Sequence, residues 1–96
     1  FVNATASGNT ELVPAQGTTM RIRVLGMIVI SATALTVEFK SGTTDISSEK
    51  PLAANGGFVL PQAETGWFQT GLNEALNVNL SAAGNVGVDV IWVQAG

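Results

Sequence analysis

The side chains of this chain that could do chemistry are acids, hydroxyls and two tryptophans. Asp45 and Glu49 are the closest pair of acids, and Ser47 and Ser48 lie between them. Oxygen ligands of this kind suit a hard cation such as calcium, but two acids without an EF-hand spacing fall short of a full oxygen cage. As the acid and base of a glycosidase, the pair would need a cleft and a set separation that a sequence does not reveal. We therefore interpret this stretch as a solvated loop and predict no metal site.

Several common reaction centres are excluded by composition. The chain contains no His, Cys or Tyr. Zinc, haem, iron–sulfur and thiol sites lose their usual ligands, and Ser-His-Asp or cysteine schemes lose their base or nucleophile. We predict that the protein is not an enzyme, has no catalytic residues and carries no cofactor.

The low charge content restricts the classes of partner that the chain can bind. Only 11% of the 96 residues are charged and 46% are apolar, whereas about 25% of a typical soluble domain is charged. The net charge of -3 argues against nucleic-acid binding, which needs clustered Lys and Arg. So little charge predicts a surface that is partly covered by copies or partners.

One apolar segment resembles a membrane or targeting signal. Residues 20–34 have the layout of a secretory signal peptide, but they follow a polar segment, and we interpret them as a buried strand. The apolar run 24–30 is far shorter than the roughly 20 residues that span a bilayer. We predict no membrane partner.

The elements that must position these side chains are strands. Apolar residues alternate with polar ones from Leu35 and again from Leu76, which indicates half-buried strands. In the longest candidate strand, residues 18–31, one face is polar before Gly26 and both faces are apolar after it. A glycine at such a change predicts a bulge or bend. Both faces of the last strand become apolar, so we expect it to be central or covered.

Turn signals and short Val- and Thr-rich segments predict an all-β fold without helices. The predicted strands are residues 1–5, 10–14, 18–31, 34–41, 43–47, 57–61, 67–71, 74–81 and 86–94. We expect a single domain over residues 1–96, an eight- to nine-stranded antiparallel β-sandwich or small barrel that is jelly-roll-like.

Four groups of residues are candidates for recognition. On the last strand, Val88, Val90 and Trp92 share one parity, and we expect them to be buried between subunits. Residues 1–7 are a candidate arm, anchored on a neighbour by strand addition through Phe1 and Val2.

The other two groups are aromatic and basic. Trp67 and Phe68 follow a glycine and form a candidate glycan platform, because an aromatic ring can stack on a sugar; packing is the alternative. Arg21 and Arg23 share a strand face and are expected to pair with acids of the same fold, such as Glu38 or Glu11, or with those of a second copy.

Three blocks of the sequence carry a family resemblance. They read VEFKSGTTDIS at residues 37–47, PLAANGGFVLP at 51–61, and GWFQT followed by EALNVNLS within 66–81. Over about residues 21–93 the chain resembles small β-sandwich virion proteins of tailed bacteriophages, of the head-decoration or cement type. Asn73 stands where that pattern often has Gly before Glu-Ala-Leu, and Asn tolerates the left-handed backbone that such a turn uses.

The resemblance implies a capsid decoration protein without enzymatic activity. Such a protein is located on the outer capsid surface of the virion, acts as a homotrimer and binds the major capsid protein. A second interpretation is a glycan-binding module of a phage tail or fibre protein that uses Trp67 and Phe68. A third is a small carbohydrate-active enzyme built on Asp45 and Glu49.

Overall fold

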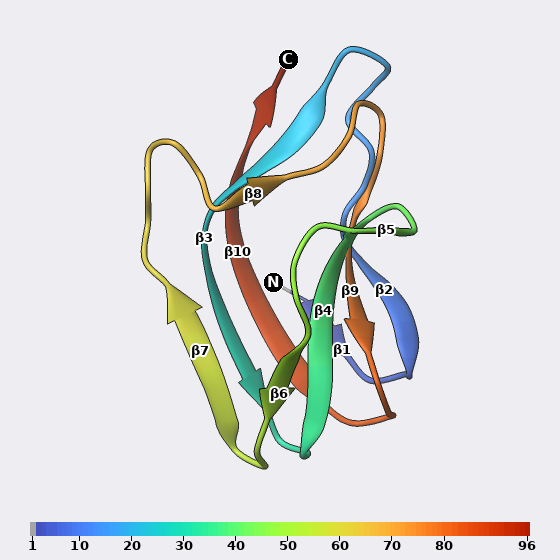
Figure 1. Cartoon of the computed structure of the whole chain (residues 1–96), viewed down its shortest axis with the longest axis vertical. Coiled ribbons are helices and arrows are strands. Elements are labelled where there is room, and N and C mark those ends of the chain that lie inside the picture. The colour runs from blue at the N-terminus through green and yellow to red at the C-terminus, as the bar shows by residue number, and fades with distance from the viewer. Residues whose placement is uncertain (1) are drawn as a thin grey trace.

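The computed structural model describes residues 2–96, which form ten strands and no helix (Figure 1). The strands are β1 (Val2–Ala4), β2 (Gly8–Val13), β3 (Arg21–Ser31), β4 (Leu35–Ser41), β5 (Thr44–Asp45), β6 (Lys50–Leu52), β7 (Gly56–Leu60), β8 (Phe68–Gln69), β9 (Leu76–Leu80) and β10 (Val86–Ala95). Within the described residues there is no helix long and apolar enough to cross a membrane. The all-β prediction is confirmed.

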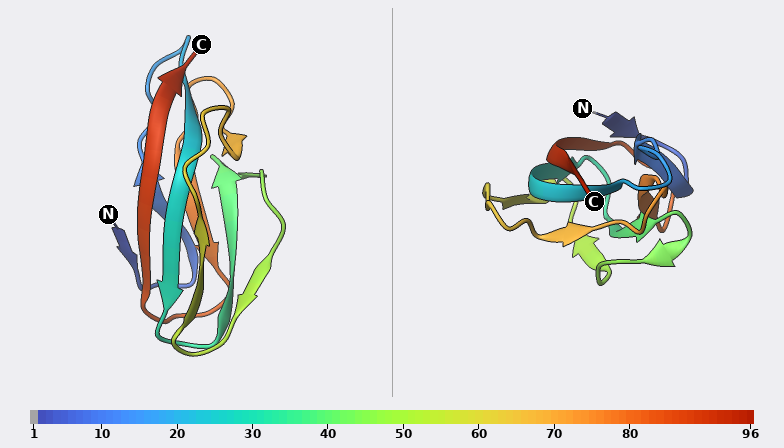
Figure 2. Two further views of the ribbon diagram at one scale, coloured as in Figure 1. Left: turned by 90° about the vertical axis from the view of Figure 1, so that its left-hand side faces the viewer. Right: turned by 90° about the horizontal axis from the view of Figure 1, so that it is seen from above.

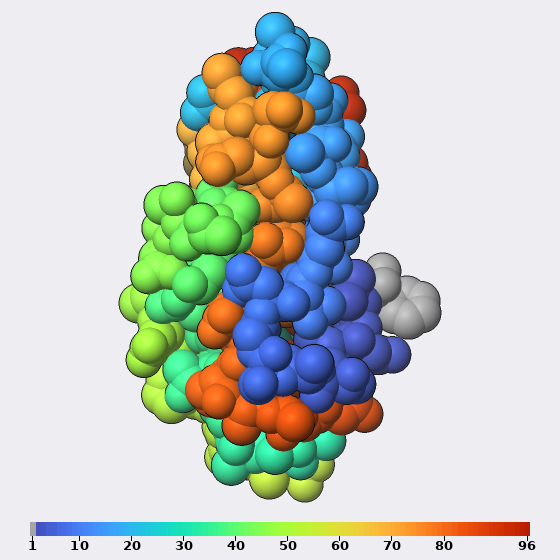
Figure 3. All heavy atoms as spheres, turned by 90° about the vertical axis from the view of Figure 1, so that its right-hand side faces the viewer, coloured from blue at the N-terminus to red at the C-terminus, as the bar shows by residue number. Residues whose placement is uncertain are grey.

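The strands form two antiparallel sheets. Sheet A has the order β1-β10-β3-β7, and β8 pairs with β3 beyond the end of β7. Sheet B has the order β2-β9-β4-β5, and β6 also pairs with β4. Figure 2 shows the sheets as two layers. In Figure 3, β2 and the loop after it are coloured blue, and they lie beside β9, which is orange. The predicted antiparallel β-sandwich is confirmed, whereas jelly-roll connectivity stays a prediction.

The strand β6 is the one element that the sequence pattern misses. It contains Pro51, and proline lacks the N–H that a central strand needs, so a proline argues against a strand. The structure places β6 at an edge, where it pairs only with β4. An edge strand tolerates proline because one side of its backbone needs no partner.

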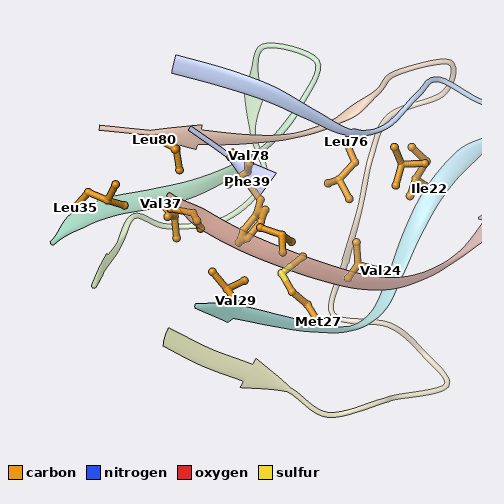
Figure 4. Packing of buried hydrophobic residues seen from close by; sticks show 14 residues of the cluster. Ile22, Val24, Met27, Val29, Leu35, Val37, Phe39, Leu76, Val78 and Leu80 are labelled. Carbon is orange, nitrogen blue, oxygen red and sulfur yellow. The ribbon is translucent and has the colours of Figure 1, made fainter. Parts of the chain in front are cut away.

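Among the described residues, fourteen buried apolar side chains form the core between the sheets (Figure 4). They are Ala4, Val13, Ile22, Val24, Met27, Val29, Leu35, Val37, Phe39, Leu76, Val78, Leu80, Val86 and Val88. The ring of Phe39 lies at their centre, stacked on Phe68 at 5.6 Å between ring centroids and edge-on to Phe58 at 6.4 Å. Burying each large apolar side chain contributes about 1.5–3 kcal/mol, so this cluster holds the two sheets together.

The predicted bulge at Gly26 is confirmed. Along the β3–β10 ladder, Gly26 pairs with Ile91 and Val24 pairs with Trp92, so Leu25 is the extra residue. A one-residue insertion reverses the faces of all side chains beyond it. Val24 therefore faces the core on one side of the bulge, while beyond it Ile28 faces outward.

The turn before β9 is fixed to β4 by side-chain hydrogen bonds. The Ser41 hydroxyl donates to Glu74 Oε1 at 2.7 Å and accepts from the backbone N–H of Gly71 at 2.8 Å. Within this turn Asn73 has φ 56°. The left-handed conformation predicted for Asn73 is therefore confirmed.

Candidate functional site

The outer face of sheet A, which points away from the core, is apolar and exposed. Its large side chains are Ile28, Ile30, Val59, Ile91 and Val93, which are 41–61% exposed. The strand register places them together, because Ile28 lies between Val59 on β7 and Asp89 on β10. Figure 2 shows β10 and β3 side by side at the surface of the molecule. Both faces of β3 and β10 carry apolar side chains, as the sequence pattern predicts. Within residues 2–96, however, no element covers the outer face.

A shallow cavity of about 280 Å³ lies on this face, between the C-terminal end of β7 and the middle of β10. Its walls include Ile28, Val59, Leu60, Asp89 and Ile91. A Cβ at Gly26 would lie 3.1 Å from the carbonyl oxygen of Leu60. The missing side chain therefore lets the chain after β7 approach β3 and form one wall of the cavity.

β1 pairs with part of one edge of β10. On that edge β1 pairs only with Val86–Val88, and within the described residues no strand continues along residues 89–95. Hydrogen-bonded and non-hydrogen-bonded pairs alternate along an antiparallel ladder, so the direction of each backbone group can be assigned.

Two sets of hydrogen bonds fix that alternation. The N–H of Ala32 donates to the carbonyl of Asn85. The backbone groups of residues 87, 89 and 91, which follow Asn85 at every second position, therefore bond to β3. The backbone groups of Val90 point away from β3. Beyond the bulge, the carbonyls of Val24 and Ile22 accept from Trp67 and Thr70 on the other side of β3. Arg21 and Arg23 therefore bond to β10, through Ala95 and Val93. The backbone groups of Val90, Trp92 and Gln94 therefore point away from β3, and the side-chain amide of Gln94 donates to Gln16 Oε1 at 2.7 Å.

The residues predicted to lie at a subunit interface fall in different surroundings. Val88 is only 1% exposed and faces the core of its own chain, so its side chain cannot reach a second copy. Val90 is half-buried beside the cavity, and Trp92 is 36% exposed. Val2 pairs with Val88, so residues 2–4 of the predicted arm form β1 of their own sheet. Phe1 lies outside the described residues.

The two residues of the candidate glycan platform point in different directions. Trp67 is 46% exposed, and its indole N–H donates to the carbonyl of Pro61 at 2.8 Å. The ring of Phe68 stacks on Phe39 at the core. A second cavity of about 260 Å³ lies beside Trp67 and also contacts Lys50. The accessible ring is therefore that of Trp67, with a lysine nearby.

One acid of the predicted loop, Asp45, belongs to a small ionic cluster around Lys40 on β4, whereas Glu49 is exposed and forms no ion pair within the described residues. Lys40 Nζ lies 3.0 Å from Asp45 Oδ1 and 3.7 Å from Glu38 Oε1. The hydrogen bond from Lys40, followed by one from Glu38, lowers the pKa of Asp45. Desolvation, then the proximity of Asp45, raises the pKa of Glu38. The structure thus pairs Asp45 with Glu38 through Lys40, and residues 2–96 contain no group of three acids placed to hold a metal ion.

Arg21 and Arg23 do not form the predicted ion pairs within the described residues. The Nε of Arg23 donates to Gln69 Oε1 at 3.3 Å. The Nε of Arg21 is buried and has no hydrogen-bond partner among residues 2–96. Arg21 is thus the one described side chain with an unsatisfied buried polar atom.

A scan against protein-family models, a search of curated proteins and a search of solved structures found no match to this chain.

Proposed function

We propose that this chain is a bacteriophage capsid decoration protein that binds the outer head surface and stabilises contacts between capsomers. The observation that carries the proposal is the exposed apolar outer face of sheet A, formed by Ile28, Ile30, Val59, Ile91 and Val93. Soluble monomers rarely expose large contiguous apolar patches, and such patches usually mark interaction sites. The resemblance of the three sequence blocks to virion proteins supplies the kind of partner.

The proposed mechanism is adhesion by a rigid sheet. The apolar face would form the core of an interface with the major capsid protein, with polar residues at its rim. Self-association, of which the homotrimer implied by the resemblance is one form, would let several weak contacts act together on neighbouring capsomers. No catalytic step is required for this role.

Co-sedimentation tests the proposal. The probe is empty heads assembled from the major capsid protein encoded in the same genome. We expect wild-type protein to saturate the heads and Val59→Lys to lose most of its binding, because the ammonium group would be desolvated in the contact. Thr44→Lys, an exposed position on β5 of sheet B, is the matched control and should bind as wild type does. Absence of wild-type binding, or full binding by the Val59 variant, would refute the proposal.

A second candidate function is glycan binding at Trp67. It is favoured by the exposed indole and by Lys50 at the adjacent cavity. Quenching or a spectral shift of tryptophan fluorescence on adding oligosaccharides, lost in Trp67→Ala and retained in Trp92→Phe, would support this function over capsid decoration.

A further inference from the structure

Both sheets are interrupted on one side of the sandwich. On sheet A, β7 pairs with β3 as far as Met27, and β8 resumes the pairing only at Val24. On sheet B, β5 and β6 pair with the two ends of β4, and between them the backbone N–H of Phe39 donates to the Ser47 hydroxyl at 2.9 Å. The cavity of about 260 Å³ beside Trp67 is lined by residues that flank both interruptions.

The strand register directs a lysine and two aromatic rings toward this cavity. Lys50 pairs with Val37, which faces the core, so its side chain extends from the inward face of β6. Phe58 and Phe68 pair with core residues of β3 and therefore also point inward. The ring of Phe39, which contacts both phenylalanines and is 1% exposed, forms the buried part of the wall (Figure 4).

We propose that this cavity binds a small carboxylate whose body is an apolar ring, with the ring against Phe58, Phe68 and Trp67 and the carboxylate at the ammonium group of Lys50. The inference does not rest on capsid binding, because it concerns this chain and a small molecule alone. It differs from glycan binding at Trp67 in the chemistry of the ligand.

The volume of the cavity suits one ring with a short substituent. An apolar cavity of about 150 Å³ accommodates benzene, so 260 Å³ leaves room for a few further atoms. Protein interiors contain few voids larger than a water molecule. Aromatic rings that surround a larger hollow lack dispersion contacts on one side, and a bound ring would supply them.

The polar groups of the cavity favour a carboxylate over a neutral sugar. The indole N–H of Trp67 already donates to the carbonyl of Pro61, and the Ser47 hydroxyl donates to the carbonyl of Ser48. A sugar carries several hydroxyls, each of which needs a partner when it loses water. Among the side chains that line the cavity, Lys50 alone keeps unused donors, because only one of its three N–H groups is needed for its bond to Ser48.

Charge complementarity points to the same class of ligand. The chain has two lysines. Lys40 lies within 4 Å of Asp45 and Glu38, whereas Lys50 forms no ion pair within residues 2–96. A carboxylate beside Lys50 would accept charge-assisted hydrogen bonds, which are about twice as strong as neutral ones. The apolar walls would strengthen this attraction by excluding water.

Tryptophan fluorescence and amide NMR spectra measure the binding, with phenylacetate as the probe. The variant Trp92→Phe keeps Trp67 as the only tryptophan, so its emission reports on the cavity. We expect saturable binding with a Kd of about 1 mM or below, as for a good ligand of this size. The largest amide shifts should fall at Lys50, Phe58 and Phe68. Neutral phenylacetamide should bind about tenfold more weakly, because it lacks the charge-assisted hydrogen bond.

Two lysine variants locate the carboxylate. Lys50→Met removes the ammonium group and keeps an apolar stem, so it should bind phenylacetate and phenylacetamide about equally. Lys40→Met removes a lysine of the same sheet that does not line the cavity, and this control should keep the preference for the acid. An inward-facing charge on an edge strand can also serve only to prevent pairing with other chains. In that case Lys50→Met would leave the preference unchanged, and the proposal would fail.

The wild-type protein alone decides the outcome if a variant does not fold, which circular dichroism detects. Absence of phenylacetate binding at tens of millimolar, equal affinity for the acid and the amide, or shifts located away from the cavity would each overturn the proposal. Methyl glucoside is titrated in the same way, and binding of this sugar without binding of phenylacetate would assign the cavity to glycans instead. None of these results depends on head binding, so that test stands separately.

Discussion

Gly57 is the position where the packing of sheet A is least tolerant of a side chain. On β7 it approaches β3 so closely that a Cβ would overlap the carbonyl oxygen of Val29 and lie 2.9 Å from the Cα of Ile30. Neither obstacle is a side-chain end that could rotate away. We predict that Gly57→Ala is destabilising because β7 must move away from β3 or lose its first pairs.

The structure contains a matched control on the same row of the sheet. Gly87 on β10 pairs with the other side of Ile30, and a Cβ there would meet only Asn3 Oδ1 at 3.6 Å and the Ile30 carbonyl at 4.0 Å. Those are ordinary contacts. Gly87→Ala therefore adds the same methyl group on a neighbouring strand without overlap.

The expected difference follows from two terms. Reducing the freedom of the unfolded chain stabilises both alanine variants by about 0.4–1 kcal/mol, and overpacking costs about 1–3 kcal/mol or more at Gly57 alone. We expect Gly57→Ala to lose about 2 kcal/mol and Gly87→Ala to gain about 0.5 kcal/mol. At about 4–8 °C per kcal/mol for a domain of this size, their Tm values should differ by about 10–20 °C.

Thermal and urea unfolding followed by circular dichroism measures both effects. All samples should have the same protein concentration, because self-association shifts the apparent stability. Equal midpoints for the two variants, or a Gly57 variant as stable as wild type, would contradict the close approach of β7 to β3.

Two further predictions concern the ionic cluster and the turn before β9. Lys40→Met should raise the pKa of Asp45 toward its ordinary value, because the hydrogen bond from Lys40 is the main cause of its lowering; an NMR titration of the carboxyl carbon measures this, and an unchanged pKa would contradict the pairing. Since the folded pKa of Asp45 is lowered, its contribution to stability is present above the unfolded pKa and lost as pH falls through the folded one. At Asn73, where φ is 56°, Gly should be tolerated, whereas Val should lower the free energy of unfolding by about 1–2 kcal/mol; similar urea midpoints for the two variants would refute this.

The strands could be predicted from the sequence because alternation of apolar and polar residues is a local property. The faces of β3 could not, because the bulge at Leu25 exists only through the pairing with β10. Gly26 marks its place, but the tertiary register decides that Met27 and Val29, rather than Ile28, enter the core. Pro51 hides β6 for a related reason, since its tolerance depends on the edge position.

The candidate site could be predicted only in part. An apolar pattern on both faces shows that a strand is suited to burial, and it does not say which chain supplies the cover. The interface assigned to Val88 illustrates this, because the same parity that suggests subunit burial places that residue in its own core. The pairing of residues 2–4 with Val86–Val88 could not be predicted, since it depends on the tertiary register between β1 and β10.

Some side chains of β10 face the core and others face outward, so substitutions along this one strand can affect either folding or contacts with a partner. Val86 and Val88 face the core, while Ile91 and Val93 face outward, so truncating either pair removes similar apolar volume from different surroundings. Val88→Ala should cost about 1–3 kcal/mol of folding free energy, because it leaves a cavity in the core. Val93→Ala should leave the folded chain nearly as stable, because the side chain of Val93 is 41% exposed on the outer face. If the two substitutions lowered stability equally, β10 would be buried on both faces within a single chain, and the outer face would lose its assignment as a contact surface.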